Sequence, residues 1–133
     1  MEFDVNYWAI LVAAISSFVV GALWYAPFLT GKVWQIETGL TDEKLKEANM
    51  GKTFGLAFVL SVIISFGMAM FFGGEADLQK GAMWGMMTAL FFVIPSLGIN
   101  DLFEHRSLKL WLINSGYNLI IYTIIGAILG AWN

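Results

Sequence analysis

Long apolar stretches alternate with short polar segments along this chain. Four of the stretches are nearly free of charge and long enough to cross a bilayer as helices, which takes about 20 residues; they cover about 5–29, 53–73, 80–100 and 108–132. Backbone groups in lipid must be hydrogen-bonded within the segment, and a single segment achieves this only as a helix. The pattern predicts an all-α integral membrane four-transmembrane-helix bundle, forming a single domain over residues 1–133.

The polar segment between the first two spans contains a helix signal of its own. Thr41 is a suitable N-cap, and Asp42 and Glu43 follow it where negative charge stabilises a helix N-terminus. We expect a short helix over about 42–49, lying near the membrane surface. The alternative is a solvated connector without regular structure.

Basic residues gather in the polar segments on one side of the predicted bundle. Six of the seven Lys and Arg residues lie there, and only Lys80 lies on the other side. Cytoplasmic loops of membrane proteins carry an excess of Lys and Arg. We therefore predict that these loops are cytoplasmic and that both termini are outside. The six residues are Lys32, Lys44, Lys46, Lys52, Arg106 and Lys109.

Composition supports a membrane protein and excludes several other classes. Hydrophobic residues make up 59% of the chain and charged residues 13%, whereas soluble domains contain roughly 25% charged residues. The net charge is −3, with no basic run that could hold nucleic acid. The chain has no Cys, which excludes disulfides and thiol chemistry. We predict the lipid bilayer as a partner, no nucleic acid and no cofactor.

Small residues recur at four-residue spacing in every predicted span. Membrane helices associate through such faces because small side chains let the backbones approach closely. The stripes predict a tight bundle and leave open whether they meet within one chain or between chains. We expect surface to remain for a homo-oligomer. The stripes are Ala9, Ala13, Ser17 and Gly21; Ser61, Ser65, Ala69 and Gly73; Gly81, Gly85 and Ala89; and Gly126 with Gly130.

The last span bears a polar stripe on the same spacing. Asn114, Asn118 and Tyr122 follow one another at intervals of four residues, and Asn118 falls near the middle of the span. An amide at that depth must meet protein, water or ligand, because leaving it unpaired in hydrocarbon costs several kcal/mol. The stripe either lines a site or path for a small solute, or forms hydrogen bonds between helices. Tyr117 points off a different face, as expected for ordinary packing.

A dense polar segment precedes the last span. On a helix, Asp101, Glu104 and His105 would lie on one side, and Arg106 follows them. Two carboxylates and an imidazole can bind a divalent cation or relay a proton. The alternative is the ordinary polarity of a loop between spans, with Arg106 explained by topology. We assign no metal ligand and no catalytic residue here.

Aromatic residues cluster at the inner end of the first span, around Trp24 and Tyr25. They indicate either a binding box or the aromatic belt common at membrane interfaces. Pro27 is expected to end or bend the helix.

Short motifs near both ends of the chain suggest a family. They are Asn6-Tyr7-Trp8-Ala9, Gly21-Ala22-Leu23-Trp24-Tyr25, Gly31-Lys32-Val33-Trp34, Leu102-Phe103-Glu104-x-Arg106-Ser107, Ile113-Asn114-x-Gly116-Tyr117 and Gly126-Ala127-Ile128-Leu129-Gly130-Ala131-Trp132. Together they resemble a bacterial membrane family known as domain of unknown function 1761, over essentially the whole chain. The chain departs from that pattern at Thr30, where an aromatic residue is common, and at Asn118, where many members have His. The resemblance implies a multi-pass protein of the bacterial cytoplasmic (inner) membrane and implies no activity.

Three functions are compatible with these patterns. The first is binding or passage of a small-molecule solute or ion along the polar face of the fourth span. The second is a structural or accessory membrane protein without a ligand. The third is a membrane enzyme that uses Glu104 and His105 on a lipid-like substrate at the cytoplasmic face. The sequence favours the first function and leans against an enzyme.

Overall fold

The computed structural model describes residues 5–132, and every regular element in that range is helical. Four helical segments are long and apolar enough to cross a membrane. The all-α, four-helix prediction is therefore confirmed. In chain order the elements are α1 (Tyr7–Trp24), α2 (Gly31–Thr38), α3 (Asp42–Glu47), α4 (Met50–Phe72), α5 (Leu78–Thr88), the π-helix η1 (Ala89–Val93), α6 (Ile94–Phe103) and α7 (Leu108–Ala131).

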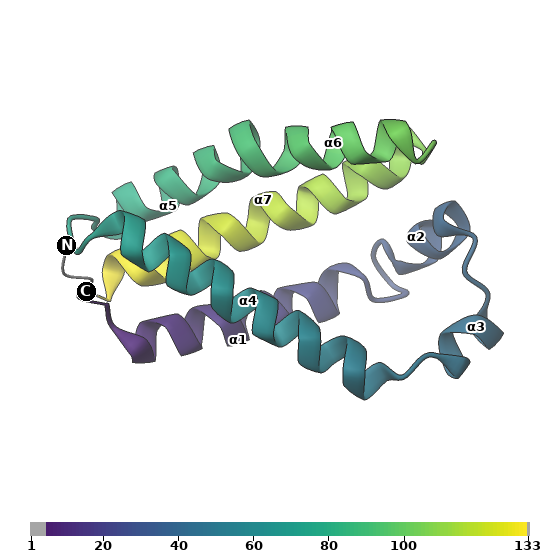
Figure 1. The fold of residues 1–133 in the computed structure, drawn as a ribbon, viewed down its shortest axis with the longest axis horizontal. Helices are drawn as coiled ribbons and strands as arrows, with labels where there is room; N and C mark the ends of the chain where they lie inside the picture. The colour runs from purple at the N-terminus through teal and green to yellow at the C-terminus, as the bar shows by residue number, and fades with distance from the viewer. Residues whose placement is uncertain (1–4, 133) are drawn as a thin grey trace.

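Helix α7 is the element against which the others pack. It contacts α1, α4 and the continuous α5–η1–α6 segment, and also the short helix α2. The two chain ends lie at one end of the bundle, which we call the terminus end (Figure 1). Helices α2 and α3 and the turn between α6 and α7 lie at the other end, which we call the α2–α3 end.

Glycines bring α5 and α7 into backbone contact. A Cβ atom built on Gly81 would overlap the carbonyl group of Gly126 and stand 3.0 Å from the Cα of Gly130. One built on Gly126 would overlap the carbonyl group of Gly81 and stand 3.2 Å from the Cα of Gly85. Only residues without a side chain allow this approach, as in other small-residue interfaces of membrane helices. The stripes of α5 and α7 therefore meet within one chain.

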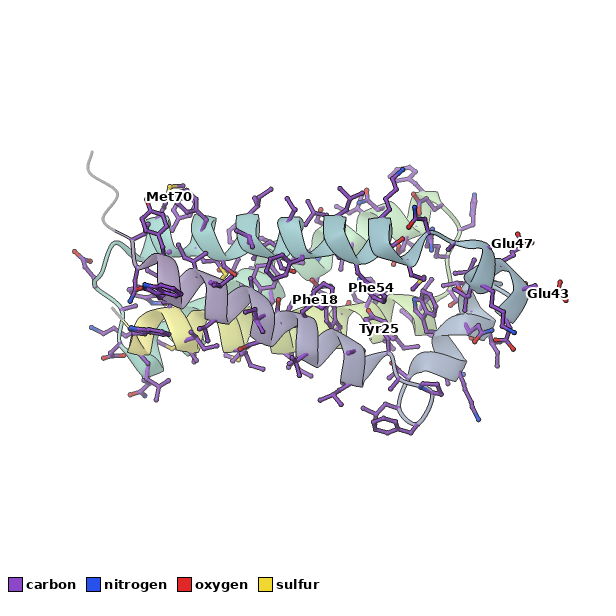
Figure 2. All side chains as sticks on the ribbon, turned by 90° about the horizontal axis from the view of Figure 1, so that it is seen from below. Phe18, Tyr25, Glu43, Glu47, Phe54 and Met70 are labelled. Carbon is purple, nitrogen blue, oxygen red and sulfur yellow. The ribbon has the colours of Figure 1, made fainter. Side chains whose placement is uncertain are left out.

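A second core joins α1, α4 and α7 near the terminus end. Ala9 and Ala13 are fully buried against Met68, Phe72 and Ile125. Ser17 of α1 and Ser65 of α4 are also fully buried. Their hydroxyls donate to carbonyls of their own helices, at 2.8 and 2.9 Å respectively. Phe18 of α1 meets Phe54 of α4 edge-on (Figure 2). Phe58 of α4 contacts the Phe18 ring with the same geometry. Small residues of α1 and α4 are therefore buried in this core, whereas Gly73, the last residue of the predicted α4 stripe, is exposed.

Helix α1 ends five residues earlier than the predicted span, at Trp24. A turn over residues 25–30 follows, because Pro27 disfavours a helical conformation in the residue before it. The Thr30 backbone N–H closes this turn by donating to the Trp24 carbonyl at 3.2 Å. The Thr30 side-chain hydroxyl donates to the same carbonyl. A Cβ on Gly31 would overlap the Tyr25 carbonyl, so the tight turn requires glycine there.

The short helix α3 begins at the predicted residue and ends two residues early. The Thr41 hydroxyl caps it, accepting from the Lys44 N–H at 3.2 Å. Asn49, predicted as the last residue of this helix, instead caps α4 by accepting from the Lys52 N–H at 3.0 Å. Helix α4 consequently starts at Met50, before the predicted residue 53.

The third membrane segment contains one π-helical turn at its middle. The Ile94 N–H donates to the Ala89 carbonyl, five residues back, directly before Pro95. Proline has no N–H, and its ring crowds the preceding turn. The widened turn accommodates the proline, so the segment continues into α6 without a break.

Candidate functional site

Helix α1 is tied to α7 by two side-chain hydrogen bonds near the α2–α3 end. The Tyr25 hydroxyl donates to the Asn114 Oδ1 at 2.7 Å. The Trp24 indole N–H donates to the Ile113 carbonyl at 3.0 Å. The Trp24 ring also lies against Gly116, where an added Cβ would stand 2.8 Å from the ring. The polar atoms of Trp24 and Tyr25 thus point to α7. In an aromatic belt these atoms would instead point to the lipid headgroups.

Three rings extend this contact. Tyr25 lies 5.2 Å from Tyr117 and 5.9 Å from Trp34 of α2, measured between ring centroids. Tyr117 in turn lies against Gly21 of α1, with 3.3 Å between its ring and an added Cβ. We call Trp24, Tyr25, Trp34, Asn114 and Tyr117 the aromatic–amide cluster. Sequence reasoning missed Tyr117, although the glycines at 21 and 116 could have indicated large rings opposite them.

The predicted polar stripe of α7 is only half-buried, and its amides have partners inside the chain. Asn114 accepts from Tyr25, as described above. The Asn118 side-chain amide donates to the Asn114 carbonyl one turn earlier, at 2.8 Å. Tyr122 packs against the core of α1, α4 and α7. The three residues share one helix face, and the aromatic–amide cluster lies at the Asn114 end of this face.

A hollow of about 570 Å³ adjoins the cluster at the α2–α3 end. Tyr25 and Trp34 form part of its wall, together with Gln35, Lys32 and Asp42. The Gln35 amide donates to the Asp42 carboxylate at 2.8 Å, which links α2 to α3. We call this space the α2–α3 hollow. Its wall combines apolar side chains with one positive and one negative group.

The structure corrects the predicted arrangement of Asp101, Glu104 and His105. Helix α6 ends at Phe103, and His105 adopts a left-handed conformation with φ 57°. The turn is closed by the Arg106 N–H, which donates to the Asp101 carbonyl at 2.9 Å. The three side chains therefore do not share a helix face, because the helix stops before two of them. Across residues 5–132 no group of three or more His, Cys, Asp or Glu side chains is placed to hold a metal ion.

Glu104 and Arg106 instead pair with each other at the surface. The Arg106 Nε donates to the Glu104 Oε2 at 2.8 Å, and their side chains are 47% and 58% exposed. Such solvated pairs contribute little to stability. Neither belongs to the aromatic–amide cluster.

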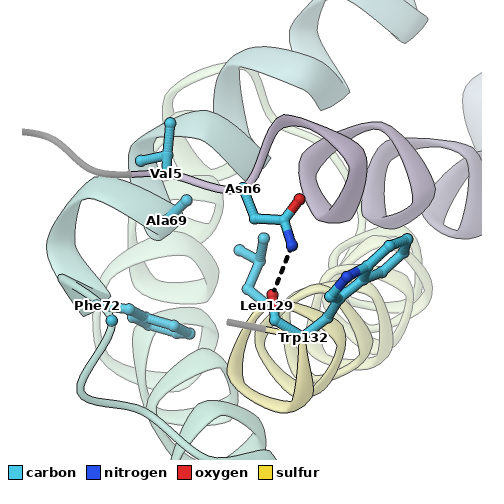
Figure 3. A pocket seen from close by; sticks show the side chains of 7 residues that line it. Val5, Asn6, Ala69, Phe72, Leu129 and Trp132 are labelled. Atoms are coloured by element: carbon cyan, nitrogen blue, oxygen red, sulfur yellow. Dashed lines mark hydrogen bonds between the residues drawn. The ribbon is translucent and has the colours of Figure 1, made fainter.

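Another hollow, of about 450 Å³, lies at the terminus end (Figure 3). Asn6 stands at its rim, and its side-chain amide donates to the Trp132 carbonyl at 3.2 Å. The Asn6 oxygen also caps α1 by accepting from the N–H groups of Trp8 and Ala9. Asn6 was not predicted as a site residue, and its contacts tie the beginning of α1 to the end of α7.

These features define the class of the molecule. It is a multi-pass α-helical integral membrane protein, whose polar groups join helices near both ends of the bundle. A family model, described as a protein of unknown function (DUF1761), matches residues 8–130. The chain belongs to this family, as its motifs suggested. No curated protein and no solved structure matches it.

Proposed function

We propose that this protein binds a small uncharged or zwitterionic solute in the α2–α3 hollow and lets it pass along the polar face of α7. The observation that supports this proposal is the position of Tyr25. Its ring forms part of the wall of the hollow, while its hydroxyl reaches the first amide of the stripe, Asn114. A solute in the hollow can exchange hydrogen bonds with Tyr25 and so reach Asn114 and then Asn118.

The lining chemistry favours this class of solute. Lys32 and Asp42 offer one charge of each sign at the hollow, which suits a zwitterion. Beyond Tyr25 the stripe consists of two amides and a phenol, which hydrogen-bond a neutral solute without demanding a counter-charge. A bare ion would have to shed its hydration without charged groups to replace it.

A structural role is the second candidate, and one observation favours it. Both asparagines of the stripe already have partners within the chain, Asn114 with Tyr25 and Asn118 with its own helix. The Tyr25–Asn114 bond joins two helices, and bonds of this kind between membrane helices average about 0.6 kcal/mol. Catalysis by Glu104 and His105 is not proposed, because Glu104 is paired with Arg106 and both lie outside the cluster.

The cellular setting is part of the proposal. The excess of basic residues at the α2–α3 end favours a cytoplasmic position for the hollow, with both termini outside. A bacterial cytoplasmic membrane is the setting implied by the family resemblance. Homo-oligomerisation stays a proposal, and it needs a surface other than the stripes of α5 and α7, which already face each other.

Passage can be tested on proteoliposomes by stopped-flow light scattering, with urea, glycerol and glycine as probes. We expect faster flux of at least one probe than in empty liposomes. Asn118→Leu should abolish that flux while the protein stays folded, because the amide at the centre of the stripe is lost. Thr123→Val is the matched control. The Thr123 hydroxyl also donates to a carbonyl of its own helix, that of Leu119 at 2.7 Å, but Thr123 is not part of the stripe.

Two results would reject passage. One is flux of all three probes equal to that of empty liposomes. The other is normal flux through Asn118→Leu together with lower stability, which would assign Asn118 to helix packing alone.

A further inference from the structure

A hollow of about 280 Å³ lies where α6 ends and α7 begins, apart from the aromatic–amide cluster. Its lining is mainly apolar, from Leu102, Leu108 and Trp111, and its polar residues are Asp101, Arg106 and Ser107. We call it the α6–α7 hollow. Taking about 30 Å³ per water-sized atom as a guide, it has room for a group of roughly nine non-hydrogen atoms.

Asp101 lacks a hydrogen-bond donor at one of its carboxylate oxygens. Its Oδ2 atom is buried and has no partner among the described residues. Two of the neighbouring donors point elsewhere: the Trp111 indole N–H donates to the Ile94 carbonyl at 3.0 Å, and the Arg106 Nε donates to Glu104. A buried carboxylate without a donor is costly, so a donor entering the adjacent hollow would stabilise it.

The surroundings of the hollow indicate where that donor comes from. Leu102 and Leu108 are 76% and 68% exposed, at the ends of helices apolar enough to span a membrane. Apolar side chains exposed there are expected to face lipid at the level where headgroups meet acyl chains. Arg106 has five N–H donors, of which Nε alone is used by Glu104, so its other groups can bind an anion beside Asp101.

We propose that the α6–α7 hollow binds the headgroup of an aminophospholipid from the surrounding bilayer. The primary ammonium donates to Asp101, the phosphate lies at Arg106, and the glycerol end of the acyl chains packs on Leu102, Leu108 and Trp111. Both charges of a zwitterionic headgroup are thereby matched. The other charged groups nearby in sequence are Lys109, which is positive, and Glu104, which is already paired with Arg106.

Lipid binding to the detergent-solubilised full chain can be measured by native mass spectrometry. The probes are phosphatidylethanolamine, phosphatidylcholine and phosphatidylglycerol with identical acyl chains. We expect phosphatidylethanolamine to bind roughly tenfold more tightly than phosphatidylcholine, whose quaternary ammonium has no N–H to donate. Asp101→Asn should remove that preference. Glu43→Gln, which removes one carboxylate charge from the exposed start of α3, should retain it.

Arg106→Gln provides a second test if Asp101→Asn does not fold. This substitution should weaken the binding of phosphatidylethanolamine and of phosphatidylcholine by the same factor, since both lipids have the phosphate. Equal binding of these two lipids to the unaltered protein would overturn the proposal. So would tighter binding of phosphatidylglycerol, which would mean that the basic residues act alone.

Two competitors separate the lipid from other sources of the same chemistry. Decylamine has the ammonium and a tail without phosphate, and O-phosphoethanolamine has the headgroup without a tail. We expect neither to displace phosphatidylethanolamine at an equal concentration. Full displacement by decylamine would reassign the hollow to lipophilic amines, and full displacement by O-phosphoethanolamine would reassign it to a soluble ligand.

Discussion

The substitution Gly126→Ala adds a single methyl group at the tightest contact of the bundle. That methyl carbon would stand 3.2 Å from the Cα of Gly85 and would overlap the carbonyl group of Gly81. Carbon atoms in contact prefer about 3.5–4.0 Å. Both neighbours are backbone atoms of α5, which cannot rotate away as a side chain can. The two helices must therefore separate along the whole glycine interface.

The size of the effect follows from two opposing terms. Overpacking a well-packed contact typically costs about 1–3 kcal/mol. Replacing glycine by alanine within a helix stabilises it by about 0.5–1 kcal/mol. The first term exceeds the second here because the obstacle is backbone, so we expect a net destabilisation of about 1–2 kcal/mol.

Gly67→Ala is the matched control. Gly67 lies within α4, and a Cβ built on it meets no atom within 4 Å. Only the helix-propensity term applies there, so this variant should be as stable as the parent or slightly more stable. The free energy of unfolding can be measured for all three proteins by titrating sodium dodecyl sulfate into mixed micelles. If Gly126→Ala proved as stable as Gly67→Ala, the α5–α7 contact described above would be wrong.

Three other predictions concern single contacts and the threading of the chain. Tyr25→Phe should lower the free energy of unfolding in the same titration by about 0.6 kcal/mol, because Asn114 loses its donor on the neighbouring helix. Tyr7→Phe, at a residue that is 72% exposed, should change nothing. Gly116→Ala should destabilise less than Gly126→Ala, since its methyl meets the Trp24 ring, which can move; an equal loss would contradict this. Reporter fusions at the C-terminus should be active outside the cytoplasm, and activity only inside it would reverse the topology.

Hydropathy was sufficient to predict the four long helices, and it was least informative at their ends. The apolar run through Tyr25, Pro27 and Phe28 continues after α1 has stopped at Trp24. A turn packed at the end of a bundle can be as apolar as a helix, so composition does not distinguish them. The signals that mark the end are local: Pro27, and Gly31 at the close approach to the Tyr25 carbonyl. Asn49 is a similar case, since a capping residue can be assigned to either neighbouring helix.

The candidate site was harder to predict because lipid removes the usual contrast between faces. In a soluble helix the apolar stripe marks the buried side, but a membrane helix is apolar toward both lipid and protein. The stripe containing Asn114 and Asn118 was therefore visible, whereas Tyr117, on another face, gave no polar signal. Tyr117 is nevertheless held between Gly21 and the Tyr25 ring. The grouping of Asp101, Glu104 and His105 failed for a different reason: periodicity cannot reveal the left-handed residue at 105.

The two ends of α7 differ in a way that bears on function. Toward the terminus end its glycines are in backbone contact with α5, which leaves no space between these helices and little freedom to move. Toward the α2–α3 end it meets α1 through side chains, with Tyr25 on Asn114 and Trp24 on Gly116. Rearranging a few side chains disturbs fewer contacts than separating packed backbones, which requires collective motion. A solute or lipid should therefore be admitted at the α2–α3 end, and substitutions in the aromatic–amide cluster should alter its binding more than equally destabilising substitutions in the glycine interface.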